Sequence, residues 1–323
     1  MNKRYLVTGG CGFIGSALVR ALVKQGDKVR ILDDCSRGIK SRLNDVEVFF
    51  CPGSIDRIEH RNAIRLAVRG VDAVIHLAYV NGTATFYTDP ALVLGVAVKG
   101  IVNLLDACAE EKVKEFHLAS SSEVYQTPPV IPTPENVPLV VPDPYNPRFS
   151  YGGGKIISEL MVLHYGNFER LTIFRPHNIY GPDMGDGHVI PQFVSRYARE
   201  CRNSTEKVVK LQIQGTGKET RCYCHIEDAV QGILAVVERG EHRGIYNIGS
   251  DEEISAADLA HAVGHCFQRL VDIVPSELAG GSTPRRCPDL TKLRGLGWSP
   301  KIKLFDGLKQ YVEWYKGEKC RVS

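Results

Sequence analysis

The 323-residue sequence lacks the features that mark membrane and nucleic-acid proteins. It has no uninterrupted run of the roughly 18 apolar residues that a membrane span needs. Neither sign of charge dominates, because 40 Lys and Arg face 37 Asp and Glu, for a net charge of +3. We therefore expect no membrane partner and no nucleic-acid partner, since the latter favours a strongly basic surface. An anionic ligand has to be bound by a local site.

Disulfide and metal frameworks are also missing. The ten cysteines are scattered singly between Cys11 and Cys320, in a long chain whose N-terminal residues lead directly into an apolar strand. The closest pair, Cys222 and Cys224, has no second pair at a zinc-like spacing. We expect reduced thiols, a cytoplasmic location and no metal site.

What the sequence does contain is a regular alternation of strand-like and helical segments. The strand-like runs in the first half are residues 5–7, 29–32, 73–75 and 115–118. This alternation predicts an α/β fold built on a doubly wound parallel sheet, the Rossmann arrangement. Because it weakens later, we expect a Rossmann domain over residues 1–175. A smaller mixed α/β lobe should cover residues 176–323, with the chain free to re-enter the first domain.

One segment is unusually rich in proline. Residues 128–147 contain eight prolines, which neither a helix nor a central strand tolerates. The composition predicts a long loop. Loops of this length in a compact domain commonly form a lid or one wall of a binding site.

The first predicted strand runs into a glycine-rich segment that opens the first predicted helix. Gly10, Gly12 and Gly15 have the spacing that permits a tight turn, close approach to a pyrophosphate and close helix packing. Asp33 ends the second strand, where a carboxylate binds the adenosine ribose hydroxyls and repels a ribose phosphate. The pattern predicts NAD as cofactor, and Arg37 keeps NADP open as the alternative.

A second pattern follows the proline-rich segment. Tyr151 and Lys155 are four residues apart, so they share one face of a helix. A lysine ammonium beside a phenol lowers the phenol pKa and makes tyrosine a usable base near neutral pH. Three glycines at 152–154 separate the two, although each costs about 1 kcal/mol relative to alanine in a helix. Some group must therefore approach this backbone closely.

Together these motifs resemble the extended short-chain dehydrogenase/reductase family, and within it the NAD-dependent nucleotide-sugar epimerases and dehydratases. The resemblance covers nearly the whole chain. It is carried by residues 8–16, 76–78, 120–122, 151 with 155, 175–182, 215–217 with 221, 246–249, 286–289 and 296–298.

The resemblance implies specific roles. The implied catalytic residues are Ser121, Glu123, Tyr151 and Lys155. The implied cofactor contacts are Gly9, Gly12, Phe13, Ile14, Gly15, Asp33, Ile55, Leu77, Ala78, Tyr151 and Lys155. The implied substrate contacts are Ser122, Asn178, Arg221 and Arg286, of which the last three would hold a diphosphate.

Four positions depart from the family pattern. Ser54 replaces an Asp that usually touches the adenine, and Tyr79 replaces an Ala after residues 76–78. Ala97 stands where a helix Asn is usual, and Gln126 where Gly is common. The first three lie near the expected cofactor, so they affect its binding rather than the overall chemistry.

Glu123 bears on the reaction. The resemblance implies oxidation of a UDP- or GDP-sugar at C4, and we favour an epimerase. Sugar 4,6-dehydratases and glucuronate decarboxylases that resemble this chain have Glu at this position, where it could remove a proton next to a ketone. These two activities and a C4 dehydrogenase are the alternatives, and a structural carboxylate bonded to backbone donors is the alternative role for Glu123.

A non-catalytic NAD-binding sensor is disfavoured, because such a protein would not need the catalytic residues Ser121, Tyr151 and Lys155.

Residues 92–108 and 156–165 are apolar around much of their helical circumference, more than one sheet face can bury. We therefore expect a homodimer that pairs these helices across a two-fold axis.

Overall fold

The structure is a computed structural model that describes residues 2–203, 206–277 and 283–322. Seven parallel strands form its central sheet, in the order β11-β6-β5-β4-β1-β2-β3. Their bounds are β1 Arg4–Thr8, β2 Lys28–Asp33, β3 Phe49–Pro52, β4 Ala73–His76, β5 Glu115–Ala119, β6 Arg170–Pro176 and β11 Gly244–Ile248. The order reverses between β1 and β4, where such sheets bind ligands at their carboxyl ends. The predicted doubly wound α/β fold is confirmed, although the sequence analysis gave no residue ranges for β3, β6 and β11.

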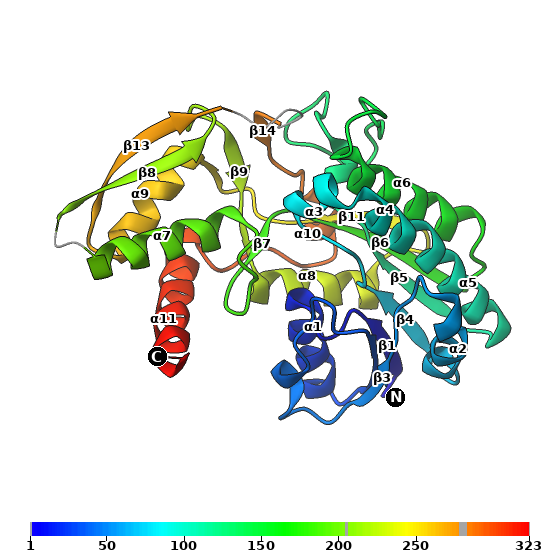
Figure 1. Cartoon of the computed structure of the whole chain (residues 1–323). Coiled ribbons are helices and arrows are strands. Elements are labelled where there is room, and N and C mark those ends of the chain that lie inside the picture. The colour runs from blue at the N-terminus through cyan, green and yellow to red at the C-terminus, as the bar shows by residue number, and fades with distance from the viewer. Residues whose placement is uncertain (1, 204–205, 278–282, 323) are drawn as a thin grey trace.

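Helices cover both faces of this sheet (Figure 1). Helices α1 Phe13–Lys24 and α8 Ile226–Arg239 share one hydrophobic core with the sheet. Helices α2 Arg61–Val68, α5 Ile101–Glu110 and α6 Phe149–His164 share the core on the other face. A parallel sheet buried on both faces requires continuous apolar strands, and residues 5–8 of β1 are all buried.

One helical run is apolar for most of its length. Helix α3 Thr83–Thr88 leads into α4 Pro90–Leu94, the π-helical turn η3 Gly95–Gly100 and α5. The stretch Pro90–Glu110 is long and apolar enough to cross a membrane by length and composition, although Lys99 and Asp106 interrupt it. Half of its most apolar window is buried inside the structure. Core helices of the kind that pack on a Rossmann sheet meet the same criterion.

The proline-rich segment is a loop, as predicted. No helix or strand occurs between the short helix η4 Ser122–Tyr125 and α6, although Thr133 forms an isolated bridge with Pro288. The backbone N–H of Thr133 donates to the carbonyl of Cys287 at 2.9 Å. The backbone N–H of Asn247 donates to Glu135 at 2.8 Å. The loop therefore fastens the end of β11 to the segment that carries Arg286.

The smaller lobe has a hydrophobic core of its own. Its helices are α7 Val189–Asn203, α9 Ala256–Cys266 and α11 Leu304–Val322, beside the parallel pair β8 Val208–Gln214 and β13 Leu270–Ser276. Two small sheets complete the strands: β7 Ile179–Tyr180 pairs with β10 Cys224–His225, and β9 Thr220–Cys222 lies between β12 Glu253–Ser255 and β14 Arg285–Arg286. After β6 the chain returns to the main sheet as β11, while a domain boundary at residue 175 stays a prediction.

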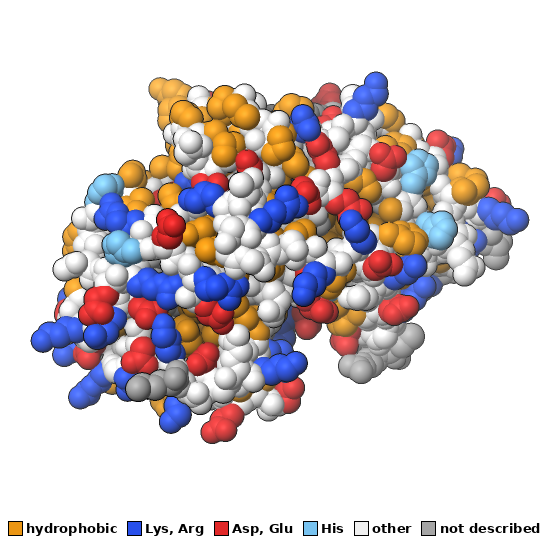
Figure 2. All heavy atoms as spheres, turned by 180° about the vertical axis from the view of Figure 1, so that it is seen from behind, with side chains coloured by type: hydrophobic (Ala, Val, Ile, Leu, Met, Phe, Trp, Pro, Cys, Tyr) orange, Lys and Arg blue, Asp and Glu red, His pale blue; other side chains and the backbone are white. Residues whose placement is uncertain are grey.

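Short elements complete the chain: η1 Lys40–Leu43, η2 Ile58–His60 and α10 Thr291–Gly295. Figure 2 shows basic and acidic side chains interspersed over one face of the molecule, without a large field of one sign. That distribution agrees with the near-balanced charge of the sequence.

Candidate active site

The glycine-rich loop after β1 forms a tight turn into α1. Gly9 has φ +71°, and a Cβ there would lie 2.7 Å from the backbone nitrogen of Ala78. A Cβ on Gly15 would lie 2.1 Å from the carbonyl oxygen of Gly9, so only glycine fits. Helix α1 begins at Phe13, which turns its free N–H groups toward the loop. This cradle fits the pyrophosphate of a dinucleotide.

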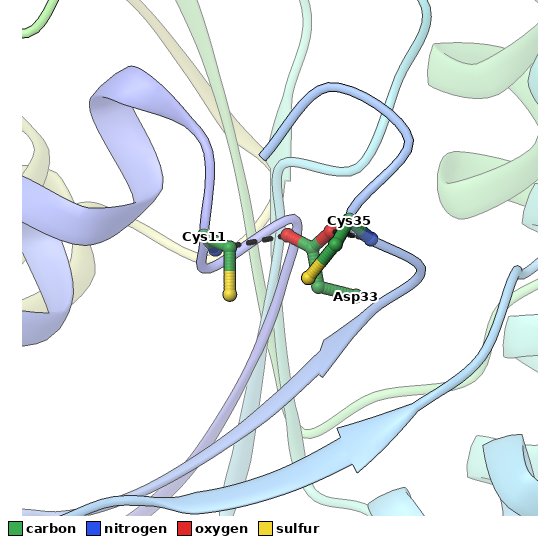
Figure 3. Close-up of side chains that lie close together, drawn as sticks. All are labelled: Cys11, Asp33 and Cys35. Atoms are coloured by element: carbon green, nitrogen blue, oxygen red, sulfur yellow. Dashed lines mark hydrogen bonds between the residues drawn. The ribbon is translucent and has the colours of Figure 1, made fainter. Parts of the chain in front are cut away.

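Asp33 is fixed at the end of β2 (Figure 3). Its two carboxylate oxygens accept backbone N–H groups from Cys11 at 2.9 Å and from Cys35 at 2.8 Å. Burial raises the pKa of Asp33, and these two hydrogen bonds oppose the increase. The side chain is thus held rigidly beside the loop, as a ribose-binding carboxylate needs to be.

The same figure shows the thiols of Cys11 and Cys35 near Asp33. One ligand atom from each of the three residues lies within 4.8 Å of the others, a grouping that the sequence analysis missed. Burial, with a contribution from Asp33, raises the pKa of Cys11 to about 12, so this thiol keeps its proton at neutral pH. A thiol is a poor metal ligand until it is deprotonated. The absence of a metal site stays a prediction.

A cavity beside the loop collects many of the residues implied as cofactor contacts. Its lining includes Gly9, Gly12, Asp33, Ile55, Leu77 and Ala78. Ser54 also lines it, and its hydroxyl donates to Asp56 at 2.5 Å. The chain therefore places a carboxylate two residues beyond the position where the family usually has one.

Ser121 and Tyr151 meet at the end of β5. The Ser121 hydroxyl lies near enough to the Tyr151 phenol to lower its pKa, and it accepts the backbone N–H of Glu123 at 3.2 Å. The Tyr151 ring stacks on Phe86 with 4.8 Å between centroids. Helix α6 and the turn η4 therefore bring the implied serine and tyrosine together.

The expected effect of Lys155 on Tyr151 is wrong for this structure. Burial raises the pKa of Tyr151 to about 12, and the hydrogen bond from Ser121 only partly offsets the increase. Burial also lowers the pKa of Lys155 to about 7. The Lys155 ammonium donates to the carbonyl of Ala119 at 2.7 Å and lies 6.0 Å from the Tyr151 ring centroid, and it is not among the groups that lower the Tyr151 pKa.

The close approach predicted at the glycines of α6 is confirmed. A Cβ on Gly154 would lie 2.4 Å from the Tyr79 hydroxyl oxygen and 2.7 Å from the Ala97 Cβ. A Cβ on Gly152 would lie 2.4 Å from the Gln126 side-chain nitrogen. Three of the four departures from the family pattern therefore pack against the glycine run.

Glu123 is paired with Arg286. The guanidinium of Arg286 donates to the Glu123 carboxylate and to the Thr283 hydroxyl, the latter at 3.1 Å. Burial alone would raise the pKa of Glu123, but the charge and hydrogen bond of Arg286 outweigh it and lower the pKa. Arg148 and Arg221 add to the lowering. Glu123 is therefore ionised at neutral pH, and its side-chain partner is a guanidinium rather than a set of backbone donors.

The remaining implied substrate residues lie around the same place. Arg221 and Arg286 are neighbours in the register of β9 and β14. Arg221 donates to backbone carbonyls, including that of Thr283 at 2.6 Å. Asn178 has φ +41° and donates to the carbonyl of Cys222 at 3.1 Å, and Ser122 is buried in η4. Asn178 and Arg221 thus donate to backbone carbonyls, whereas Arg286 contacts the Glu123 carboxylate.

Sequence reasoning missed Arg148, whose charge reaches Glu123. Among the described residues, the Nε atoms of Arg148 and Arg286 and the hydroxyl of Ser150 are buried without a hydrogen-bond partner. Buried donors without a protein partner call for a water molecule or a ligand. The sequence signal for Arg148 is its place three residues, about one helical turn, before Tyr151.

A buried ion pair between Arg175 and Glu159 lies next to the site, and sequence reasoning did not predict it. Arg175 binds Glu159 with a shortest distance of 2.6 Å and donates to the Tyr125 hydroxyl at 2.8 Å. Glu159 also accepts from Ser120. The sequence signal for Glu159 is that it follows Lys155 by four residues and therefore shares one face of α6 with it.

Comparisons with known proteins agree with this arrangement. Residues 5–249 match the model of the NAD dependent epimerase/dehydratase family. A UDP-N-acetyl-alpha-D-glucosaminuronate decarboxylase from Bacillus cytotoxicus is 33% identical, and the match covers 98% of each chain. UDP-glucuronic acid decarboxylase 1 of Arabidopsis thaliana is 31% identical over 97% of this chain and 70% of the relative.

Solved structures show the same fold. UDP-glucose 4-epimerase from Thermotoga maritima superposes with a TM-score of 0.84 at 28% identity, covering 98% of this chain and 99% of the other. A dTDP-glucose 4,6-dehydratase from Streptomyces venezuelae, solved with NAD bound, has a TM-score of 0.85 at 28% identity and covers 98% of both chains. The chain therefore belongs to the NAD-dependent epimerase/dehydratase family of enzymes, whose cofactor is NAD.

Proposed function

We propose that this enzyme is an NAD-dependent decarboxylase of a UDP-linked hexuronate, which it oxidises at C4. The observation that carries the proposal is the ion pair between Glu123 and Arg286 beside Tyr151 and Ser121. The two relatives described above, which act on UDP-linked uronates by name, support the same choice. It replaces the epimerase outcome that the sequence favoured.

The ionised state of Glu123 separates the alternatives. A base that removes a ring proton next to a ketone works best with a pKa near the working pH. The pKa of Glu123 is lowered instead, which makes this carboxylate a weak base and disfavours a 4,6-dehydratase. Decarboxylation needs no base at C5, because the electron pair of the breaking bond between C5 and the carboxylate carbon moves toward the C4 ketone.

The roles of the side chains follow from this chemistry. Tyr151, acting in its phenolate form, takes the proton of the C4 hydroxyl, and Ser121 holds the reacting oxygen. Bound NAD would supply a reversible hydride acceptor for the oxidation at C4. Arg286 orients the substrate carboxylate through its buried, unpartnered Nε. The charge of Glu123 disfavours a second carboxylate nearby and so favours the loss of uncharged CO2.

The cofactor roles are proposals of the same kind. We assign the pyrophosphate to the loop of Gly9, Gly12 and Gly15, and the adenosine ribose to Asp33. The diphosphate of the substrate would be met by Arg148 and Arg221, whose two positive charges remain in excess once Arg286 is paired with Glu123. That excess suits a diphosphate without requiring a basic surface.

A substrate panel tests the proposal. The protein with NAD is incubated separately with UDP-glucuronate, UDP-N-acetylglucosaminuronate, UDP-glucose and UDP-N-acetylglucosamine, and products are identified by mass spectrometry and, for epimers of equal mass, by proton NMR. We expect at least one uronate to lose the mass of CO2 and both neutral sugars to remain unchanged. Conversion of UDP-glucose, with both uronates untouched, would overturn the proposal in favour of an epimerase or dehydratase.

A further inference from the structure

Tyr79 stands where relatives of this family commonly have alanine, and it contacts both members of the Tyr151 and Lys155 pair. The Lys155 ammonium lies 3.7 Å from the centroid of the Tyr79 ring. The Tyr79 ring meets the Tyr151 ring edge-on, with 5.1 Å between centroids. Its hydroxyl lies 3.5 Å from the backbone oxygen of Tyr151. The side chain thus fills the corner between the two residues.

Helix α6 is shaped to receive this ring. Gly154 leaves the space that the Tyr79 hydroxyl occupies, since a Cβ there would lie 2.4 Å from the oxygen. Glycine inside a helix is disfavoured unless something requires it. Ala97, which is smaller than the asparagine common in relatives, borders the same space. Tyr79 and Ala97, two of the departures from the family pattern, therefore both pack against Gly154.

The surroundings of Lys155 explain what the ring contributes. Lys155 is 3% exposed, and its nearest charged neighbour is Glu159, whose oxygens are already bound to Arg175 and Ser120. His76 is neutral, because burial, with a contribution from Lys155, lowers its pKa to about 3. The other contacts are the Ala119 carbonyl and the rings of Tyr79 and Tyr151. An aromatic face attracts an ammonium most strongly where water is excluded.

We propose that Tyr79 is a positioning residue that holds the Lys155 ammonium in its charged form and in place beside Tyr151. The proposal rests on the function proposed above, in which Tyr151 is the base. It differs from a packing role, because it depends on the aromatic face and not only on the volume of the side chain. A residue with a face but no hydroxyl should therefore work, and an aliphatic residue of similar bulk should not.

The test compares Tyr79→Leu with Tyr79→Phe. Burial already lowers the pKa of Lys155 to about 7, so loss of the aromatic face should lower it further, by roughly one unit. We expect Tyr79→Leu to lose roughly fivefold in turnover at pH 7, with the basic limb of the pH profile moved to lower pH. Tyr79→Phe should stay within about twofold of wild type, with an unmoved limb.

A second readout needs no substrate. The pKa of Lys155 is measured by NMR in protein that contains 13C-labelled lysine, with Lys155→Arg to assign the signal. A lower Lys155 pKa in Tyr79→Leu and an unchanged one in Tyr79→Phe support the proposal. Equal pKa values in wild type and both variants overturn it, as does a loss in Tyr79→Phe as large as that in Tyr79→Leu. If Tyr79→Leu does not fold, Tyr79→Met takes its place with the same expectations.

The two proposals fail separately. If wild type leaves both uronates unchanged, the proposed reaction is wrong, and the NMR titration still decides the role of Tyr79. If wild type releases CO2 and the titration shows no shift, the reaction stands and the role of Tyr79 is overturned.

Discussion

Two glycine-rich segments border the site, and they use glycine for opposite purposes. In the loop after β1, the space beside Gly15 is filled by the carbonyl oxygen of Gly9, which is backbone. In α6, the space beside Gly154 is filled by side chains, those of Tyr79 and Ala97. The loop leads into the first turn of α1, whose N–H groups have no helical partner and can meet a ligand, whereas α6 accommodates side chains from distant segments of the chain.

The largest effect is expected at Tyr151 on α6. If α6 carries the chemistry and the glycine-rich loop binds the cofactor, a change at Tyr151 should affect turnover but not NAD binding. Tyr151→Phe should reduce turnover by roughly 10²- to 10⁴-fold, the usual contribution of a general base. NAD affinity should stay nearly unchanged, since the ring still stacks on Phe86. Turnover is followed by CO2 release and NAD affinity by calorimetry. A loss of only severalfold would remove Tyr151 from the role of base.

The two segments can also be compared directly by alanine substitution. Gly15→Ala brings a Cβ to 2.1 Å from backbone, so we expect loss of NAD binding that no side-chain change restores. Gly154→Ala should cost roughly 1–3 kcal/mol of stability through overpacking. Adding Tyr79→Phe and Ala97→Gly removes both colliding atoms and should recover most of that loss. Thermal unfolding measures each variant, and failure of the triple variant to recover would contradict the contrast.

Sequence patterns predicted the loop better than the helix for a physical reason. Gly9, Gly12, Gly15 and Asp33 belong to one strand-helix-strand unit, so their spacing alone fixes their proximity. The groups that crowd α6 come from distant segments. The spacing could show that something approaches Gly154, but not that Tyr79 does.

The ion pair of the site was beyond sequence reasoning for the same reason. Glu123 and Arg286 are 163 residues apart and meet only because β14 lies beside β9. Both were singled out separately, one as a base and the other as a phosphate ligand. Their pairing lowers the pKa of Glu123, which changes the predicted chemistry of both.

On the loop side, a smaller effect is expected at Asp33. Asp33→Asn keeps an oxygen for the N–H groups of Cys11 and Cys35 but removes the charge that faces the ribose. NAD affinity should fall roughly tenfold or more. Discrimination against NADP should also relax, because the repulsion of a ribose phosphate is lost. An unchanged preference in parallel NAD and NADP titrations would contradict the assignment.

On the helix side, the buried Lys155 gives a pH signature. Its pKa falls from the ordinary 10.5 to about 7 on folding, so the unfolded chain holds the extra proton between these values. The contribution of Lys155 to stability therefore rises with pH across this interval. Lys155→Met should be more stable than wild type below pH 7, and its advantage should shrink toward pH 10. Parallel unfolding curves with a pH-independent difference would argue against a buried charge.

The smallest effect on the active site is expected from substitutions on the exposed outer face of α6. Leu160 and Tyr165 are 53% and 58% exposed there, and Leu92 on the neighbouring α4 is 43% exposed. We predict that this face forms a homodimer. Leu160→Glu should give a monomer in sedimentation, while the control Leu66→Glu on α2, also exposed, should not. A wild-type monomer at all concentrations would refute the prediction.

The central claim is that the pair of Glu123 and Arg286 directs a C4 ketone toward loss of CO2. It is tested most directly by following UDP-glucuronate with the wild-type enzyme and NAD in heavy water by proton NMR. The account predicts a UDP-pentose that carries one deuterium at C5, because the carbon that loses CO2 takes its new proton from solvent. A UDP-hexuronate with its C4 hydroxyl inverted and no carbon-bound deuterium would contradict it.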